Sequence, residues 1–89
     1  VVEKPNINEA PSNNAVIGRY ILPKKIFYIL KNQKKGKGGE IHITDAIRTL
    51  IKQNNKFIGH NFEGKYLDCG TMHGYIKSSL EIVKSWNFV

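Results

Sequence analysis

The sequence predicts an α/β fold in which helices flank a mixed sheet. Three observations indicate it. Residues 15–22 form an almost wholly apolar run, which is typical of a strand covered on both faces. Apolar residues recur at helical spacing after Pro23 and again after Thr44. Two short strand-like segments meet at Glu63-Gly64, which favours a β-hairpin.

The N-terminal quarter of the chain is expected to hold two strands. Residues 1–4 end at Pro5, which lacks the amide hydrogen that a sheet ladder needs. An asparagine-rich loop with Pro11 as a second breaker covers residues 6–14. Residues 15–22 then form the buried strand.

Two helices follow. Pro23 suits the start of the first helix, because the first turn needs no backbone N–H, and that helix ends near Gln33. Its buried stripe comprises Ile26, Phe27, Ile29 and Leu30. Residues 34–39 form a flexible glycine loop. Thr44 is expected to cap the second helix, and Asp45 in its first turn complements the helix dipole. The apolar face of this helix comprises Ala46, Ile47, Leu50 and Ile51, and polar residues 52–55 end it.

The C-terminal third predicts a hairpin and a helix. Residues 56–62 and 65–68 are the expected hairpin strands, and the last helix covers residues 71–86. The core side of this helix comprises Met72, Ile76, Leu80 and Val83, flanked by Tyr75 and Trp86.

Composition limits the classes of function. The 89 residues suffice for one small domain, and the formal net charge is +7. Lysines gather at positions 31, 34, 35 and 37, either as a solvated loop or as an anion-binding surface, and no aromatic residues are interleaved to stack bases. We therefore expect no nucleic-acid partner. The single cysteine, Cys69, excludes an internal disulfide and favours a cytoplasmic location, and no apolar run is long enough for a membrane helix.

Four motifs carry the functional information. They are VEKP at residues 2–5, AVIGRYIL at 15–22, GGEIHITDAI at 38–47 and FEGKYLDCG at 62–70. In this order and spacing they closely resemble the C-terminal part of the bacterial UTP–glucose-1-phosphate uridylyltransferases, from Val1 to about Trp86. The resemblance implies a Rossmann-like nucleotidyltransferase sandwich. Residues 1–89 would form the C-terminal, sugar-binding portion of its single domain, and the N-terminal, nucleotide-binding portion is absent from this sequence.

The resemblance also implies the reaction. The parent enzyme would join UTP and glucose 1-phosphate to give UDP-glucose and pyrophosphate with Mg²⁺, and this chain alone would be inactive. Its apolar strand needs cover on both faces, so the chain is expected to form a homo-oligomer or to associate with the missing N-terminal portion. Two alternatives stay open: another sugar-1-phosphate nucleotidyltransferase, or a non-catalytic basic module that binds nucleic acid or a subunit.

Site roles come from the same resemblance. Glu3 would contact the sugar and Lys4 its phosphate, whereas an exposed ion pair is the structural alternative. Gly18 would border the sugar pocket, or would only provide packing space. Glu40 and Thr44 would line the sugar side, although capping alone accounts for the residue type of Thr44.

Asp68 is the candidate metal ligand. Related enzymes use an acidic residue here to help an upstream aspartate hold Mg²⁺, which prefers oxygen ligands and few protein contacts. A cap on the last helix is the equal alternative for Asp68. Residues 59–65 match the start of a P-loop, but Tyr66 stands where a Ser or Thr is required, and no helix follows directly. No nucleophile paired with a base is visible.

Overall fold

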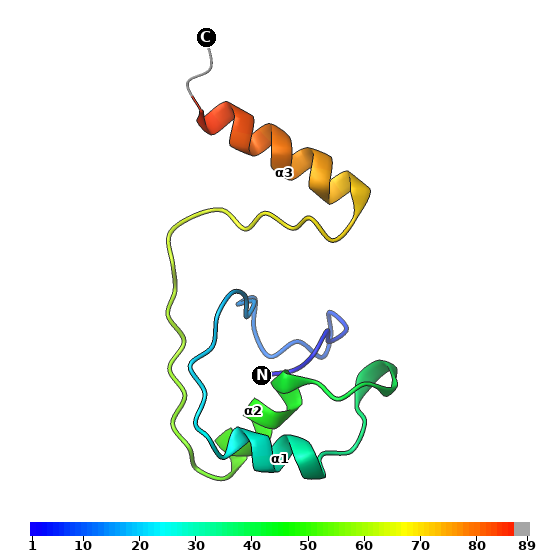
Figure 1. Ribbon diagram of the computed structural model, residues 1–89, viewed down its shortest axis with the longest axis vertical. Coiled ribbons are helices and arrows are strands. Elements are labelled where there is room, and N and C mark those ends of the chain that lie inside the picture. The colour runs from blue at the N-terminus through cyan, green and yellow to red at the C-terminus, as the bar shows by residue number, and fades with distance from the viewer. Residues whose placement is uncertain (87–89) are drawn as a thin grey trace. The chain divides into compact units, whose positions relative to one another are not determined.

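The computed structural model describes residues 1–86 of the chain. Across that range the backbone forms three α-helices and one 3₁₀ turn (Figure 1). They are α1 (Ile26–Asn32), η1 (Lys37–Gly39), α2 (Ile43–Lys52) and α3 (Met72–Ser85). The chain divides into two compact units, Val1–Ile58 and Gly59–Val89. The first unit holds α1, η1 and α2, and the second holds α3.

The predicted mixed sheet is absent from residues 1–86, so the α/β fold class was wrong for this chain. The four segments expected as strands are irregular. They are residues 1–4, 15–22, 56–62 and 65–68. A strand is stable only when its backbone amides and carbonyls bond to a neighbouring strand. Apolar patterning describes the side chains alone, and no two of these segments pair.

The predicted β-hairpin fails for a local reason as well. A two-residue hairpin turn of the common type needs positive φ at both central residues. Among the described residues other than glycine, only Lys4 and Asn54 have positive φ, so Glu63 does not adopt that conformation. Residues 65–68 pack beside α3 instead of pairing with residues 56–62. The hydroxyl of Ser78 donates to the Asp68 carbonyl oxygen at 3.4 Å.

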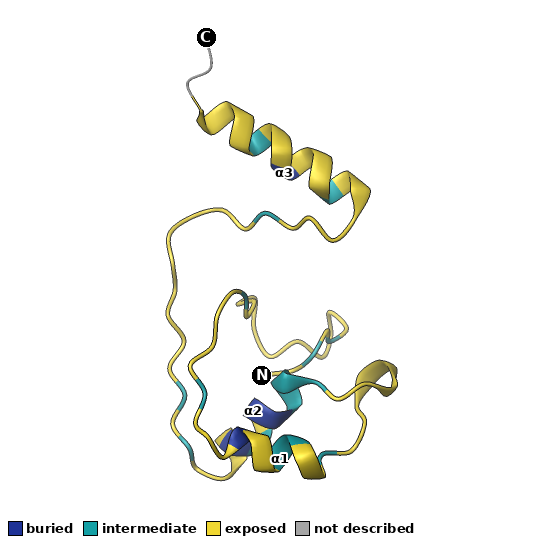
Figure 2. Cartoon of the chain, in the orientation of Figure 1, coloured by how far each residue is buried: buried dark blue, intermediate teal, exposed yellow. Residues whose placement is uncertain are grey.

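The core of the first unit lies where α1 packs on α2 (Figure 2). Its buried side chains are Ile26, Ala46, Ile47 and Leu50. Partly buried apolar residues surround them: Leu22, Ile29, Leu30, Ile43 and Phe57. The predicted face of α2 is therefore confirmed, apart from Ile51, which is exposed. The predicted stripe of α1 holds for Ile26 and is wrong for Phe27, which is 72% exposed.

The helix ends follow ordinary backbone chemistry. Pro23 precedes α1 by three residues, and its carbonyl oxygen accepts from the Ile26 amide at 3.0 Å. At the other end, α2 ends at Lys52, and Asn54 follows with a φ of 65°, the left-handed conformation that asparagine tolerates. The Asn55 side chain then donates to the Leu50 carbonyl oxygen at 2.9 Å and satisfies the last turn.

The second unit is built on α3. Thr71 caps this helix, its hydroxyl accepting from the Gly74 amide at 3.0 Å. The expected core side of α3 is exposed within the described residues, at Met72, Ile76, Leu80 and Val83, and Ser78 is the buried position. No helix within residues 1–86 is both long and apolar enough to cross a bilayer.

Candidate functional site

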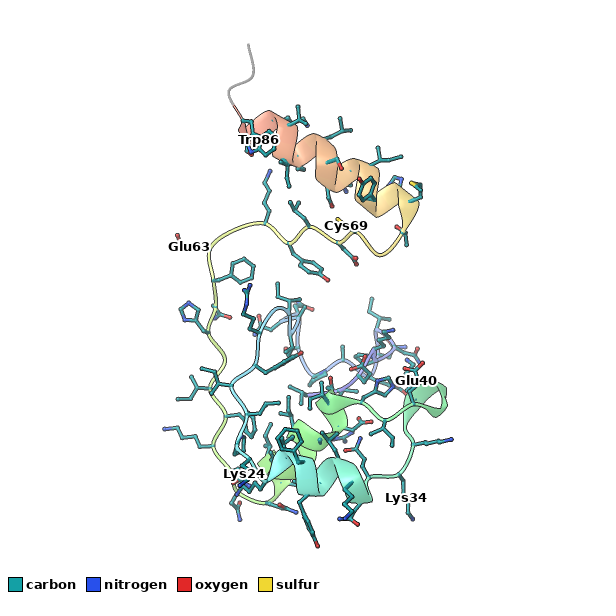
Figure 3. All side chains as sticks on the ribbon, in the orientation of Figure 1. Lys24, Lys34, Glu40, Glu63, Cys69 and Trp86 are labelled. Atoms are coloured by element: carbon teal, nitrogen blue, oxygen red, sulfur yellow. The ribbon has the colours of Figure 1, made fainter. Side chains whose placement is uncertain are left out.

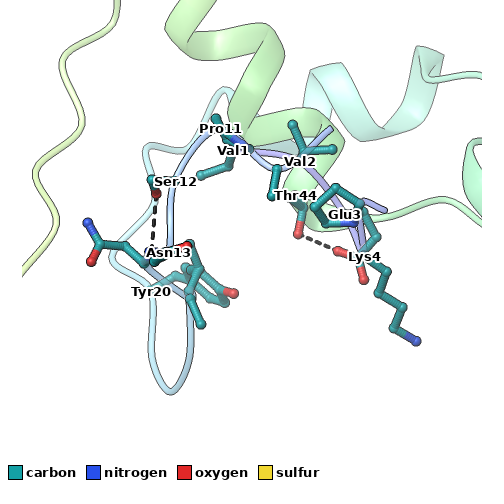
Figure 4. Close-up of a pocket in the computed structure, with 14 residues that line it drawn as sticks. Val1, Val2, Glu3, Lys4, Pro11, Ser12, Asn13, Tyr20 and Thr44 are labelled. Atoms are coloured by element: carbon teal, nitrogen blue, oxygen red, sulfur yellow. Dashed lines mark hydrogen bonds between the residues drawn. The ribbon is translucent and has the colours of Figure 1, made fainter. Parts of the chain in front are cut away.

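The first unit contains a pocket of about 670 Å³ (Figure 4). It is lined by residues 1–5, residues 10–16, Tyr20 and Thr44. The N-terminal segment, the loop after it and the start of α2 thus converge on one hollow. Pockets that hold small molecules commonly measure roughly 300–1,000 Å³, so this one is large enough for a sugar phosphate.

Glu3 and Thr44 meet at this pocket. The Thr44 hydroxyl donates to Glu3 Oε2 at 2.7 Å across 41 positions of sequence, and both residues are partly buried. The other carboxylate oxygen, Oε1, makes no hydrogen bond within residues 1–86. Because a carboxylate accepts several hydrogen bonds, Glu3 is held in one orientation and keeps an acceptor for a ligand hydroxyl.

The expected capping role of Thr44 was wrong. The N-cap of α2 is His42, which makes no side-chain capping bond, and Thr44 is the second residue of the helix. Its hydroxyl bonds to the carboxylate of Glu3 instead. Asp45 does lie in the first turn, as the helix dipole favours.

Lys4 is exposed and lies in a bend with a φ of 40°. In Figure 4 its ammonium group extends away from the Glu3–Thr44 pair. Its backbone carbonyl accepts a hydrogen bond from the Lys37 ammonium group. The VEKP motif is therefore joined to two other segments, through Glu3 to α2 and through Lys4 to η1.

Two predicted site residues do not reach this pocket. Glu40 is exposed at the end of η1 (Figure 3), and it is not among the lining residues. Gly18 is exposed, has a φ of 82°, and has no heavy atom within 4 Å of the position that a side chain would take. Tight packing therefore does not explain this glycine, whereas its positive φ does.

Lys37 is the residue that sequence analysis missed. Its place among the clustered lysines suggested a solvated loop or an anion-binding surface, and neither interpretation includes a bond to a residue 33 positions away. A single sequence carries no signal for such a contact, because the contact depends on how the glycine loop folds.

Asp68 belongs to the second unit. Its Oδ1 accepts from the Gly70 amide at 2.8 Å, which shapes the bend before α3. Thr71, not Asp68, supplies the helix cap. Within residues 1–86 no three His, Cys, Asp or Glu side chains gather closely enough to hold a metal ion. The neighbouring Cys69 is exposed and unpaired (Figure 3).

A shallow hollow of about 440 Å³ lies between residues 65–68 and α3. Lys65 and Glu81 form an ion pair of 2.6 Å at its border. The hydrogen bond and charge of Lys65 lower the pKa of Glu81, with Lys84 adding a smaller effect. The Lys65 side chain is 75% exposed and the Glu81 side chain 28%, so solvent screens this pair, which orients residues 65–68 without contributing much stability.

Comparison with known proteins places these residues in context. The family model described as nucleotidyl transferase matches residues 1–85. The chain is 48% identical over 79 residues to UTP--glucose-1-phosphate uridylyltransferase of Pseudomonas aeruginosa, covering 89% of this chain and 28% of that protein. It is 48% identical over 80 residues to UTP--glucose-1-phosphate uridylyltransferase 2 of Streptococcus pyogenes serotype M3, covering 90% and 26%.

A third relative, UTP--glucose-1-phosphate uridylyltransferase 1 of Staphylococcus saprophyticus, is 45% identical over 80 residues, covering 90% of this chain and 28% of that protein. The chain therefore spans between a quarter and a third of the length of these relatives. No solved structure matches the chain.

Proposed function

Because the chain belongs to the nucleotidyl transferase family, we propose that it supplies the sugar-phosphate side of an enzyme that makes UDP-glucose. In this proposal residues 1–89 are the C-terminal, sugar-binding portion of a nucleotidyltransferase domain. The observation that carries the proposal is the contact between Glu3 and Thr44 at a pocket that Lys4 also lines. The names of the relatives supply the substrates, UTP and glucose 1-phosphate.

The reaction needs positioning and charge neutralisation. A phosphate oxygen of glucose 1-phosphate attacks the α-phosphorus of UTP, a new P–O bond forms, and the bond to pyrophosphate breaks. Glu3 orients the sugar through its hydroxyl groups, with Oε2 held by Thr44. The ammonium group of Lys4 offsets the negative charge of the sugar phosphate. No side chain of this chain forms a covalent intermediate, and the rate would come from orientation and electrostatics.

Asp68 is proposed as a ligand of Mg²⁺. Its Oδ1 is engaged by the Gly70 amide, whereas Oδ2 makes no hydrogen bond within residues 1–86. One exposed carboxylate oxygen fits this ion, which takes one or two carboxylates and completes its octahedron with phosphates and waters. Mg²⁺ would neutralise charge on the phosphates.

The proposal includes an assembly. The side chains of Met72, Ile76, Leu80 and Val83 are apolar and exposed along α3. Such a surface costs free energy in water and is ordinarily covered. We propose that it is covered by the N-terminal portion of the enzyme or by another copy of the chain.

The decisive experiment grafts this chain into a complete relative. Residues 1–85, which the nucleotidyl transferase family model matches, would replace the corresponding segment of the Pseudomonas aeruginosa enzyme, a chimera that we call the complemented enzyme. We expect magnesium-dependent synthesis of UDP-glucose from the complemented enzyme and none from the 89-residue chain alone. An inactive but folded complemented enzyme, or turnover by the chain alone, would contradict the proposal.

A matched pair of variants tests the site itself. Glu3→Gln removes the charge of the proposed sugar ligand, whereas Glu9→Gln makes the same change in the exposed loop that follows. We expect Glu3→Gln to raise KM for glucose 1-phosphate about tenfold or more, with KM for UTP unchanged. Glu9→Gln should match the parent enzyme.

A further inference from the structure

The loop between α1 and α2 has a defined conformation, although its sequence predicts flexibility. The Gln33 side chain donates to the His42 carbonyl oxygen at 2.9 Å and closes the two ends of the loop. Within it, the Gly36 amide donates to the Glu40 carbonyl oxygen at 2.8 Å. His42 Nε2 lies 2.7 Å from the Lys37 carbonyl oxygen. The backbone that carries Lys37 is therefore fixed by contacts at both sides.

The loop also lies directly against the start of α2. A Cβ atom added at Gly36 would stand 2.5 Å from Asp45 Oδ2, a distance that real side chains do not reach. Glycine at this position allows the loop to approach the first turn of α2, which also carries Thr44. Lys37 is thus presented from the same region that holds Glu3.

Lys4 needs support from outside its own segment. Its φ of 40° lies in a region that side chains other than glycine rarely adopt. It also precedes Pro5, and a residue before proline is ordinarily extended. Strained conformations of this kind persist only where neighbouring groups hold them. The hydrogen bond from the Lys37 ammonium group to the Lys4 carbonyl oxygen is such a restraint.

We propose that Lys37 is a positioning residue for the sugar-phosphate site, acting on Lys4 through the backbone. By holding the Lys4 carbonyl group, it fixes the bend from which the side chains of Glu3 and Lys4 project. Small misplacements of binding groups cost much affinity. The Lys37 hydrogen bond would therefore affect the affinity for the ligand, although Lys37 itself does not contact the ligand. The inference rests on the function proposed above for Glu3 and Lys4.

The test uses three variants of the complemented enzyme. Lys37→Met keeps the length of the side chain and removes the donor, and Lys37→Arg keeps a donor. Lys35→Met is the control, because Lys35 is exposed in the same loop and makes no hydrogen bond within residues 1–86. We expect Lys37→Met to raise KM for glucose 1-phosphate about fivefold to tenfold with KM for UTP unchanged. Lys37→Arg should restore most of the loss, and Lys35→Met should change neither constant.

Unchanged kinetics in Lys37→Met would overturn the inference. An equal rise of both KM values, or a loss of thermal stability, would also overturn it, because either result indicates a general structural role. If the parent complemented enzyme is inactive, the proposed function fails first. The contact can still be tested in the labelled 89-residue chain by NMR. There, Lys37→Met should shift the Lys4 and Glu3 amide resonances and Lys35→Met should not, and unshifted resonances would refute the contact independently of any reaction.

Discussion

Thr44 donates a 2.7 Å hydrogen bond to Glu3, so the first turn of α2 fixes the orientation of a carboxylate that lies 41 positions earlier in the sequence. The bond brings together two of the four motifs that the sequence displays separately. It leaves one oxygen of Glu3 for a ligand and explains why a threonine stands at a helix position where it provides no cap.

Replacing Thr44 tests this relationship. Thr44→Val in the complemented enzyme removes the hydroxyl and keeps the side-chain shape. We expect KM for glucose 1-phosphate to rise about tenfold, because a hydrogen bond to a charged group contributes about 1.5–3 kcal/mol. Steady-state kinetics with each substrate varied in turn measure the effect. Thr49→Val is the control, since the Thr49 hydroxyl bonds only to the Asp45 carbonyl oxygen of its own helix. An equal effect from both variants would refute an orienting role for Thr44.

Leu50 anchors the small core. It is fully buried between α1 and α2, and truncation of such a residue costs about 2–5 kcal/mol. We expect Leu50→Ala to abolish most of the helical circular dichroism contributed by the first unit of the 89-residue chain. Ile51→Ala removes an exposed apolar side chain from the adjacent position of the same helix and should cost less than about 1 kcal/mol. Equal losses from the two variants would contradict the observed core.

A substitution at Gly74 sets the helix propensity of α3 against its packing on residues 65–68. Gly74→Ala favours an isolated helix by about 1 kcal/mol, but its new Cβ atom would lie 2.4 Å from the Asp68 carbonyl oxygen. Relieving that clash costs about 1–3 kcal/mol. We therefore expect a net loss of about 1 kcal/mol in the thermal stability of the complemented enzyme. Ser79→Ala, at an exposed position of α3, should leave stability unchanged. A stabilised Gly74→Ala variant would mean that residues 65–68 do not contact α3 in this way.

The Lys65–Glu81 pair predicts a pH effect with a definite sign. Lys65 lowers the pKa of Glu81 below its ordinary value of 4.5 in the folded chain. The pair therefore contributes stability above that ordinary value, and the contribution is lost as pH falls through the lowered pKa. An NMR titration of the Glu81 carboxyl carbon should show the pKa rising in Lys65→Met. Lys77→Met should change it far less, because Lys77 contributes the smallest of the effects on this group. An equal Glu81 pKa in the parent chain and in Lys65→Met would show that the ion pair does not form in solution.

Sequence reasoning was accurate where local chemistry determines the outcome. The apolar spacing of Ala46, Ile47 and Leu50 correctly predicted the buried face of α2, because helical periodicity needs no distant partner. The strands failed for the opposite reason. Residues 15–22 are apolar enough for a buried strand, yet no segment within residues 1–86 pairs with them.

For the candidate site too, the sequence predicted individual residues but not the contacts between distant segments. Motifs identified Glu3 and Thr44 as separate candidates, and only the folded chain shows the bond between them. Lys37 lacked any motif role, and its contact with Lys4 depends on the folded glycine loop. Glu40 and Gly18 were selected from their motifs and do not line the pocket. Their proposed contacts with the sugar gain no support from its geometry.

The first unit has only four buried apolar side chains, which has a calorimetric consequence. The heat capacity increment and the denaturant sensitivity of unfolding both scale with the surface that becomes exposed. Both quantities will be small for this chain, so heating will melt its helices gradually over a wide interval of temperature. Binding of a ligand or of a covering partner would be detected as a steeper melting curve. The steepness alone would report the binding, even if the midpoint temperature did not change.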